Sequence, residues 1–212
     1  MTKMRERYRA HVREEVKAAA LEQLAAGGPA SLSVNAIAKA MGVSGPALYR
    51  YFANRDELLT ELVLDAYADA AVALKTAVAQ ARPGERFEAF ADAYRAWALA
   101  QPHRYRLLYA EPLPGYDAQR EALVEAAQRL MAVLADVIAE RPAGAPDPRL
   151  ARQLARWARA RGVDLDPPHA LRAITAWTRL HGLVGLEIDG NFDSMGIDPA
   201  LLYAAEVAAL AG

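Results

Sequence analysis

The sequence predicts an all-α protein with a small head over residues 1–55, built as a three-helix helix-turn-helix, and a larger helical bundle over residues 56–212. Apolar residues recur at helical spacing along most of the chain, and alternation of period two never extends beyond a few residues. Glycine and proline divide the chain into segments of helical length. Basic side chains gather near the N-terminus, which distinguishes the head from the bundle by its charge.

Three helices are expected in the head. The first covers residues 5–26, ends at a Gly-Gly-Pro sequence, and has four apolar residues on one face: Val12, Val16, Ala20 and Leu24. Ser33 is expected to cap a second helix over residues 34–41. A third helix begins near Ser44 and runs to residue 52. The two short helices and the glycine-containing turn between them form the pattern of a helix-turn-helix.

A long helix over residues 55–80, capped by Asn54 with Glu57 as its capping-box partner, is expected to join head and bundle. A loop is expected over residues 112–116 and a Pro/Gly-rich linker over 142–148. The bundle is predicted to contain six further helices, over residues 83–100, 103–109, 117–140, 148–161, 167–189 and 199–210. Three of them begin at an Asp-Pro pair, in which aspartate caps the helix and proline occupies its first turn.

Residues 1–55 carry nine basic and four acidic side chains, a net charge of +5, whereas the rest of the chain carries 16 basic and 22 acidic ones, a net charge of −6. A basic head on an acidic body is typical of a protein whose head binds a polyanion. The alternative is a chance excess of charge on a solvated first helix. Likewise, four arginines are either an arm that reaches DNA or solvated side chains: Arg5, Arg7, Arg9 and Arg13.

In the head, Ile37, Ala38 and Leu48 are expected to form an apolar wedge between the two short helices. The outward face of the third helix then presents Tyr49, Arg50 and Tyr51 to DNA, because arginine binds guanine or phosphate and tyrosine hydroxyls bind phosphate. Backbone N–H groups near Ser33 and Arg55 lie at helix N-termini, where phosphates bind readily.

The segment SVNAIAKAMGVSGPALYRYFANRDELL, residues 33–59, resembles the head of TetR-type regulators. Their pattern is a helix, A-x-x-x-G-V-S, a short helix ending in L-Y-x-Y/H-F, then a basic residue and E-L-L/F. The resemblance implies that Tyr49, Tyr51 and Arg55 contact the DNA backbone. It also implies a groove-facing set: Ser44, Gly45, Pro46, Ala47 and Arg50. The chain departs from the pattern at Gly45 and Pro46, where family members often carry longer polar side chains, so Arg50 is expected to contribute more of the specificity.

The segment ITAWTRLHGLVGLEIDGNF, residues 174–192, is similar to the W…HGL…LE…G segment of TetR-type regulators with the C-terminal domain called WHG. This resemblance implies a helix near a dimer interface beside a ligand pocket. The last two long helices are also apolar around much of their circumference, which favours pairing with their symmetry mates. We therefore expect a homodimeric repressor that is released from double-stranded operator DNA by a small-molecule effector.

Six side chains of the bundle are candidates for the effector pocket: Tyr94, Trp97, Tyr105, Tyr109, Trp177 and His181. Two of the pairs, three or four residues apart, share a helix face. Such a pocket would be mainly apolar with a few hydrogen-bonding groups, which favours an apolar or amphipathic effector over a polyanion. In the alternative interpretation these aromatic side chains are ordinary core and the histidine is a hydrogen-bonded core residue.

Composition and motifs exclude several classes of protein. Apolar residues make up 54% of the 212 residues, and cysteine is absent, so we expect a packed core without disulfides or cysteine-ligated metals. Neither a transmembrane helix nor a signal peptide is expected, which predicts a cytoplasmic protein. No H-E-x-x-H, P-loop or G-x-S-x-G motif is present, so we expect no catalytic residues, cofactor or metal site. A helical binding or enzyme-like module whose head contacts proteins is the alternative.

Overall fold

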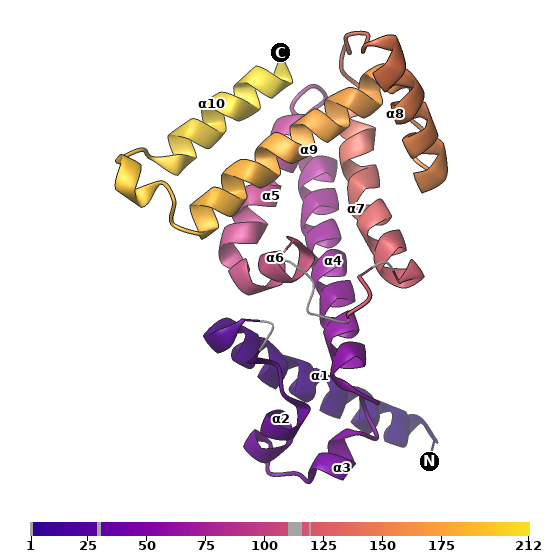
Figure 1. Cartoon of the computed structure of the whole chain (residues 1–212), viewed down its shortest axis with the longest axis vertical. Helices are drawn as coiled ribbons and strands as arrows, with labels where there is room; N and C mark the ends of the chain where they lie inside the picture. Colours follow the sequence, from indigo (N-terminus) through magenta and orange to yellow (C-terminus); the bar gives the residue numbers. More distant parts are fainter. Residues whose placement is uncertain (1, 29–30, 110–115, 119) are drawn as a thin grey trace. The chain divides into compact units, whose positions relative to one another are not determined.

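The computed structural model describes residues 2–28, 31–109, 116–118 and 120–212. Over these ranges the chain forms α-helices and short 3-10 segments but no strand, which confirms the predicted all-α class (Figure 1). The helices are α1 (Thr2–Gly27), α2 (Val34–Ala40), α3 (Gly45–Leu48), α4 (Arg55–Gln80), α5 (Arg86–Ala100), α6 (Pro102–Tyr109), α7 (Glu121–Ala139), α8 (Pro148–Arg161), α9 (Pro167–Ile188) and α10 (Pro199–Ala211). Among the described residues, no helix is long and apolar enough to cross a membrane.

The chain divides into two compact units, which are described separately. The head unit contains Met1–Ala66 and His103–Leu123, and the body unit contains Tyr67–Pro102 and Val124–Gly212. Helix α4 contributes residues to both units. The functional division at residue 55 that the sequence suggests stays a prediction, because compactness alone does not test it.

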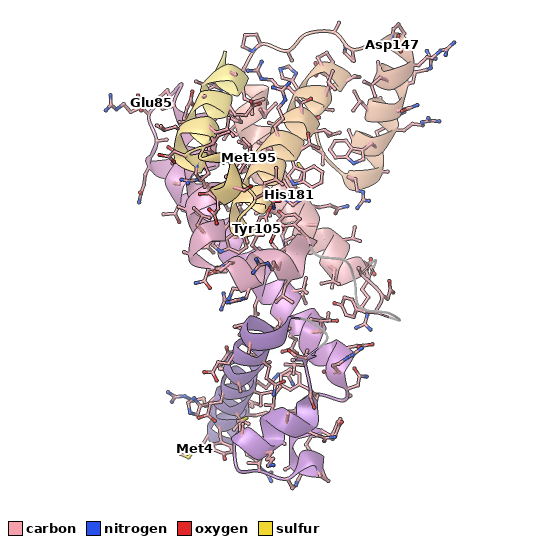
Figure 2. All side chains as sticks on the ribbon, turned by 60° about the vertical axis from the view of Figure 1, so that its left-hand side comes forward. Met4, Glu85, Tyr105, Asp147, His181 and Met195 are labelled. Atoms are coloured by element: carbon pink, nitrogen blue, oxygen red, sulfur yellow. The ribbon has the colours of Figure 1, made fainter. Side chains whose placement is uncertain are left out.

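Side chains at the helix N-termini explain where several helices begin. Ser33 Oγ accepts a hydrogen bond from the Ala36 N–H at 3.3 Å, as predicted. The three Asp-Pro helix starts are also confirmed, and Figure 2 shows Asp147 at the start of α8. Their carboxylates accept N–H hydrogen bonds over the following distances: Asp147 from Arg149 at 2.8 Å, Asp166 from His169 at 3.0 Å, and Asp198 from Ala200 at 2.8 Å.

The start of α4 differs in one detail from the predicted capping box. Asn54 Oδ1 accepts the Glu57 N–H at 2.8 Å, which confirms Asn54 as the cap. The Glu57 carboxylate accepts a hydrogen bond from the Ala53 N–H, whereas in the standard capping box it would accept one from the N–H of the cap residue, Asn54. Two backbone donors are therefore satisfied at this helix start.

The core of the head unit contains the residues that the sequence assigns to it. The wedge residues Ile37, Ala38 and Leu48 are each at most 1% exposed, and Phe52 is fully buried. On α1 the apolar face is likewise buried at Val16, Ala20 and Leu24, while Val12 is half-buried. Truncating a buried aromatic residue of this kind typically costs about 3–5 kcal/mol, so the short third helix depends on this core more than on its own hydrogen bonds.

Four helix boundaries differ by three or more residues from the prediction, and one of them is the start of α5, which lies at Arg86 and not at residue 83. Helix α1 begins at Thr2, and α3 keeps only four helical residues before it continues as hydrogen-bonded turns. Helix α7 begins at Glu121 and not near residue 117. The reason is an anchor on α4: the Tyr116 hydroxyl lies 3.1 Å from Thr60 Oγ1, and Arg120 Nη1 donates to the same oxygen at 2.9 Å. Most of the predicted loop over 112–116 lies outside the described residues, and the 3-10 helix Asp193–Met195 was not predicted.

In the body unit, α9 is the central helix: α5, α8 and α10 all pack on it (Figure 1). Its buried side consists mainly of small residues, with Ala170, Ala173 and Ala176 fully buried. Because alanine projects little from the helix, neighbouring helices approach α9 closely.

Polar groups tie α5 to the C-terminal helices of the body unit. Arg95 of α5 makes a two-pronged ion pair with Glu187 of α9, with Nε donating at 2.8 Å, and this contact raises the pKa of the guanidinium. The Tyr203 hydroxyl of α10 donates to the Ala91 carbonyl of α5 at 2.7 Å in a buried setting.

We predict that Tyr203→Phe lowers the free energy of unfolding by about 0.5–1.5 kcal/mol, because it removes a buried side-chain hydrogen bond between α10 and the Ala91 carbonyl of α5. Urea unfolding followed by circular dichroism measures the change. The control is Tyr8→Phe, which removes the hydroxyl of a tyrosine that is 66% exposed. Equal midpoints for both variants would show that the hydrogen bond contributes nothing net.

Candidate nucleic-acid interface and body pocket

The turn between α2 and α3 fixes the orientation of α3. Gly42 has φ of +69°, a backbone conformation that other residues adopt only with strain. Its neighbour Val43 donates its N–H to the Ala38 carbonyl at 2.9 Å, which closes the end of α2. The chain therefore reverses within three residues and brings α3 against α2.

Helix α3 and the turns after it separate a buried side from an exposed one. Leu48 and Phe52 face the core, as the sequence predicts, whereas Tyr49 is 44% exposed, Arg50 is exposed and Tyr51 is half-buried. At the start of α3, Ser44 and Pro46 are exposed. The other four residues of the predicted DNA-contact set are half-buried: Ser33, Gly45, Ala47 and Arg55. No residue of this set is buried.

Gly45, one of the two residues at which the chain departs from the family pattern, faces the Asn35 side chain of α2. A Cβ atom at this position would lie 3.0 Å from the side-chain oxygen of Asn35 on α2. A larger residue would therefore require the exposed Asn35 side chain to shift slightly.

Residues of α1 border the same surface. A hollow of about 630 Å³ is lined by Arg5, Glu6, Tyr8 and Arg9 of α1 together with Ala47, Arg50 and Tyr51. Arg9 also donates to the Arg50 carbonyl at 3.2 Å. Ala47, Arg50 and Tyr51 of the predicted contact set therefore lie beside Arg5 and Arg9, two of the four N-terminal arginines whose role the sequence left open.

The other two predicted phosphate contacts, Ser33 and Arg55, already have contacts within the chain. The Ser33 N–H donates to Gln23 Oε1 at 3.0 Å, so this amide is already hydrogen-bonded. Arg55 lies 3.4 Å from the Asp56 carboxylate, a long contact between half-buried side chains. The guanidinium of Arg55 remains accessible, while the Ser33 amide would need to exchange its partner.

Sequence reasoning missed the role of Arg13. Its guanidinium donates to the Tyr51 carbonyl and to the Glu61 carboxylate, and it stacks over the Phe52 ring at 4.3 Å from the centroid. Arg13 therefore packs within the head unit and is not part of a solvated arm.

Lys17 lies four residues further along α1. Burial alone would lower its pKa, but its hydrogen bonds to Asp65 and Glu14 outweigh burial and raise the pKa.

The aromatic candidates of the bundle lie in both units. In the body unit, Tyr94 is buried and stacks on Phe90, and buried Trp97 donates its indole N–H to Asp69 at 2.9 Å. Tyr105 and Tyr109 belong to the head unit, where their ring centroids are 4.9 Å apart. These four positions are occupied by packing contacts with neighbouring aromatic or acidic residues.

Trp177 and His181 share one face of α9. Their rings stack with centroids 5.7 Å apart and an interplanar angle of 9°. Burial lowers the pKa of His181 below its usual value of 6.5, which favours the neutral imidazole near pH 7.

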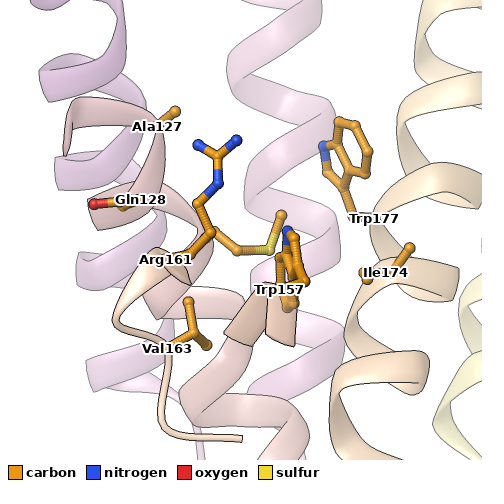
Figure 3. Close-up of a pocket in the computed structure, with 8 residues that line it drawn as sticks. Ala127, Gln128, Trp157, Arg161, Val163, Ile174 and Trp177 are labelled. Carbon is orange, nitrogen blue, oxygen red and sulfur yellow. The ribbon is translucent and has the colours of Figure 1, made fainter. Parts of the chain in front are cut away.

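A pocket of about 350 Å³ lies in the body unit between α7, α8 and α9 (Figure 3). Trp177 is the one candidate of the predicted six among its lining residues. The other lining residues were not predicted: Ala127, Gln128 and Met131 of α7, Trp157 and Arg161 of α8, Val163, and Ile174 of α9. The spacing of Trp157 and Arg161, four apart on one helix, was the signal that could have found them.

Two family models match separate parts of the chain. Residues 17–62 match the one described as bacterial regulatory proteins of the tetR family, and residues 87–210 match the tetracyclin repressor-like C-terminal domain. The chain belongs to the TetR family. This TetR-family protein is a DNA-binding transcription regulator with a helix-turn-helix.

Individual relatives agree with the family assignment. The TetR-family chain is 32% identical to the HTH-type transcriptional regulator Rv1816 of Mycobacterium tuberculosis, over 93% of this chain and 92% of the relative. It is 44% identical to the regulatory protein SCO4313 in its crystal structure, with a TM-score of 0.83 and 97% of both chains covered. A protein from Rhodococcus sp. RHA1 is 26% identical, with a TM-score of 0.72 over 94% of this chain and 93% of that one.

We predict that the stability of the wild type falls more steeply than that of His181→Gln between pH 7.5 and 5.5. The folded pKa of His181 is lowered, so the unfolded chain binds more protons as pH drops through about 6.5, and acid favours unfolding. Urea midpoints at both pH values measure the difference. Val72→Gln, which introduces the same amide at an exposed position of α4 without removing a titratable group, should retain the wild-type slope. Parallel slopes for all three proteins would contradict the assignment to His181.

Proposed function

We propose that this chain is a homodimeric repressor that binds double-stranded operator DNA through α3 and is released by a small apolar or amphipathic effector. The observation that carries the proposal is the accessible row Tyr49, Arg50 and Tyr51 beside the basic side chains of Arg5 and Arg9. Arginine and tyrosine provide the phosphate and base contacts that such a surface needs. The net charge of +5 over residues 1–55 favours association with the phosphate backbone.

Release by an effector is proposed to be allosteric. A dimer reads two half-sites only when its two heads match successive major grooves. An effector that binds one conformation of the body more tightly shifts the population toward it. The mainly apolar pocket of the body unit supports an apolar or amphipathic effector for this step.

We predict that Tyr49→Ala and Arg50→Ala each weaken binding to a duplex from the region upstream of the protein's own gene. Each loses a phosphate or base contact, which costs about 1–3 kcal/mol, or roughly 5- to 150-fold in affinity. Fluorescence anisotropy at several salt concentrations measures this. Affinity should also fall steeply with salt, because bound phosphates release counterions.

The matched control for these variants is Arg152→Ala, which removes an exposed arginine from α8 of the body unit. Wild-type affinity for all three variants would rule out the proposed docking face. Absence of DNA binding by the wild type, with a protein partner captured by the head, would favour the protein-contact alternative.

The dimer is proposed to form through α9 and α10. On α9, Thr178, Gly182 and Leu186 form an exposed stripe at spacing of four, and a Cβ at Gly182 would meet no atom within 4 Å. On α10, Leu201 is 71% exposed, and alanines occupy much of the remaining exposed face. Two such helices and their symmetry mates make a four-helix interface, which is a common isologous arrangement.

We predict that Gly182→Arg raises the dimer dissociation constant at least about tenfold, because it places unpaired charge in a closely packed interface. Sedimentation velocity over a concentration series measures the change. Val72→Arg introduces the same side chain at an exposed position of α4 in the body unit and should remain dimeric. A fully dimeric Gly182→Arg protein would place the interface elsewhere.

A further inference from the structure

We propose that the pocket between α7, α8 and α9 binds an apolar monocarboxylate, with Arg161 as the partner of the carboxylate and Trp157 and Trp177 as walls for the apolar part. The proposal deepens the function proposed above, on which it rests, by naming the chemical class of the effector and the residues that hold it. It concerns the body unit alone, since every lining residue belongs to that unit.

The walls of the pocket favour an apolar occupant. Two indoles, from α8 and α9, and the side chains of Met131, Ile174 and Val163 supply most of the lining (Figure 3). The volume of about 350 Å³ falls in the range of small-molecule sites. Flat aromatic walls stack well on a planar ring. The Trp177 ring is itself held by stacking on His181, so this wall is already oriented.

The polar groups of the pocket specify the charge of the ligand. Arg161 and half-buried Gln128 both line it, and neither side chain forms a hydrogen bond or ion pair within the described part of the chain. No acidic side chain is among the lining residues. An unpaired guanidinium beside an unpaired amide can bind the two oxygens of one carboxylate, through a forked ion pair and an N–H donor.

Other arginines of the body unit differ from Arg161 in this respect. Arg95 pairs with Glu187, Arg141 with Glu88, and Arg179 with Glu206. The other four arginines of α8 are exposed, as Arg161 is, but none of them lines the pocket. Arg161 is distinguished because it lies four residues after Trp157, on the same helix face.

Ligands of other charge fit this arrangement less well. A cation would meet Arg161 on a helix that carries five arginines and no acidic residue. A neutral apolar molecule would fill the walls but would gain nothing from the guanidinium and the amide, whose partners would remain water. A polyanion would bring more charge into an apolar lining than one arginine neutralises. A single carboxylate on an apolar body matches both the walls and the polar groups.

The test uses isothermal titration calorimetry on the full chain with two probes of one shape, 2-naphthoate and uncharged 2-naphthalenemethanol. We expect the wild type to bind the carboxylate more tightly than the alcohol. Arg161→Gln should weaken naphthoate binding about tenfold, the scale of one charge-assisted hydrogen bond at an accessible site, and leave alcohol binding unchanged. Arg159→Gln, on the same helix but outside the pocket, should bind both as the wild type does.

Equal affinity for the two probes, or unchanged naphthoate binding by Arg161→Gln, would overturn the carboxylate assignment. No heat with either probe would overturn the site itself. If, in that case, Trp157→Glu converts a dimer to a monomer in sedimentation, the pocket is covered by a second copy of the chain. Trp157→Ala should abolish binding of both probes, and its circular dichroism spectrum checks that it remains folded.

A separate measurement distinguishes failure of this site from failure of the proposed function. Operator binding by the wild type is measured by anisotropy with and without saturating 2-naphthoate. Release of DNA by naphthoate, lost in Arg161→Gln, supports both proposals. Calorimetric binding that depends on Arg161 but leaves DNA affinity unchanged supports the site and contradicts release by its occupant.

Discussion

Beside the buried core of the head unit, one side chain, Arg13, constrains the arrangement of the proposed DNA-binding surface. Its guanidinium bonds to the Tyr51 carbonyl, pairs with Glu61 of α4 and covers the face of Phe52. These contacts join α1, the end of the α3 segment and α4 at a single point. Because α3 has only four helical residues, Tyr51 and Phe52, which follow it, are held by this side chain of α1 as well as by their own backbone hydrogen bonds.

Local signals in the sequence were sufficient for most of the fold. Caps such as Ser33 and Asp166 act on N–H groups within three residues of themselves, so their effect can be inferred without knowing the tertiary structure. The wedge of Ile37, Ala38 and Leu48 followed from helical spacing and a glycine turn. The start of α7 could not be predicted from local signals, because Arg120, the residue before it, bonds to Thr60, which lies 60 positions away in the sequence.

The candidate sites also differ in how far the sequence alone predicts them. The exposed face of α3 followed from the motif and from knowing which of its residues must be buried. The body pocket did not, because it needs side chains from three helices whose mutual placement no local pattern records. Aromatic spacing alone pointed to Tyr94 and Trp97, and both are packed against neighbours within the body unit. Arg161 stood in a run of arginines that looked uniformly solvated.

Helix α8 differs from its neighbour α9 in how freely its residues can vary. The buried alanines of α9 leave no room for larger side chains without displacing α5, α8 or α10. In contrast, α8 is capped by its own Asp147 and Gly162 and has just Leu154 and Ala158 buried. Substitutions at the exposed α8 residue that lines the pocket, Arg161, can therefore change the chemistry of the pocket without disturbing Leu154 or Ala158. New chemical preferences would be acquired most readily by evolving this one helix on an unchanged scaffold.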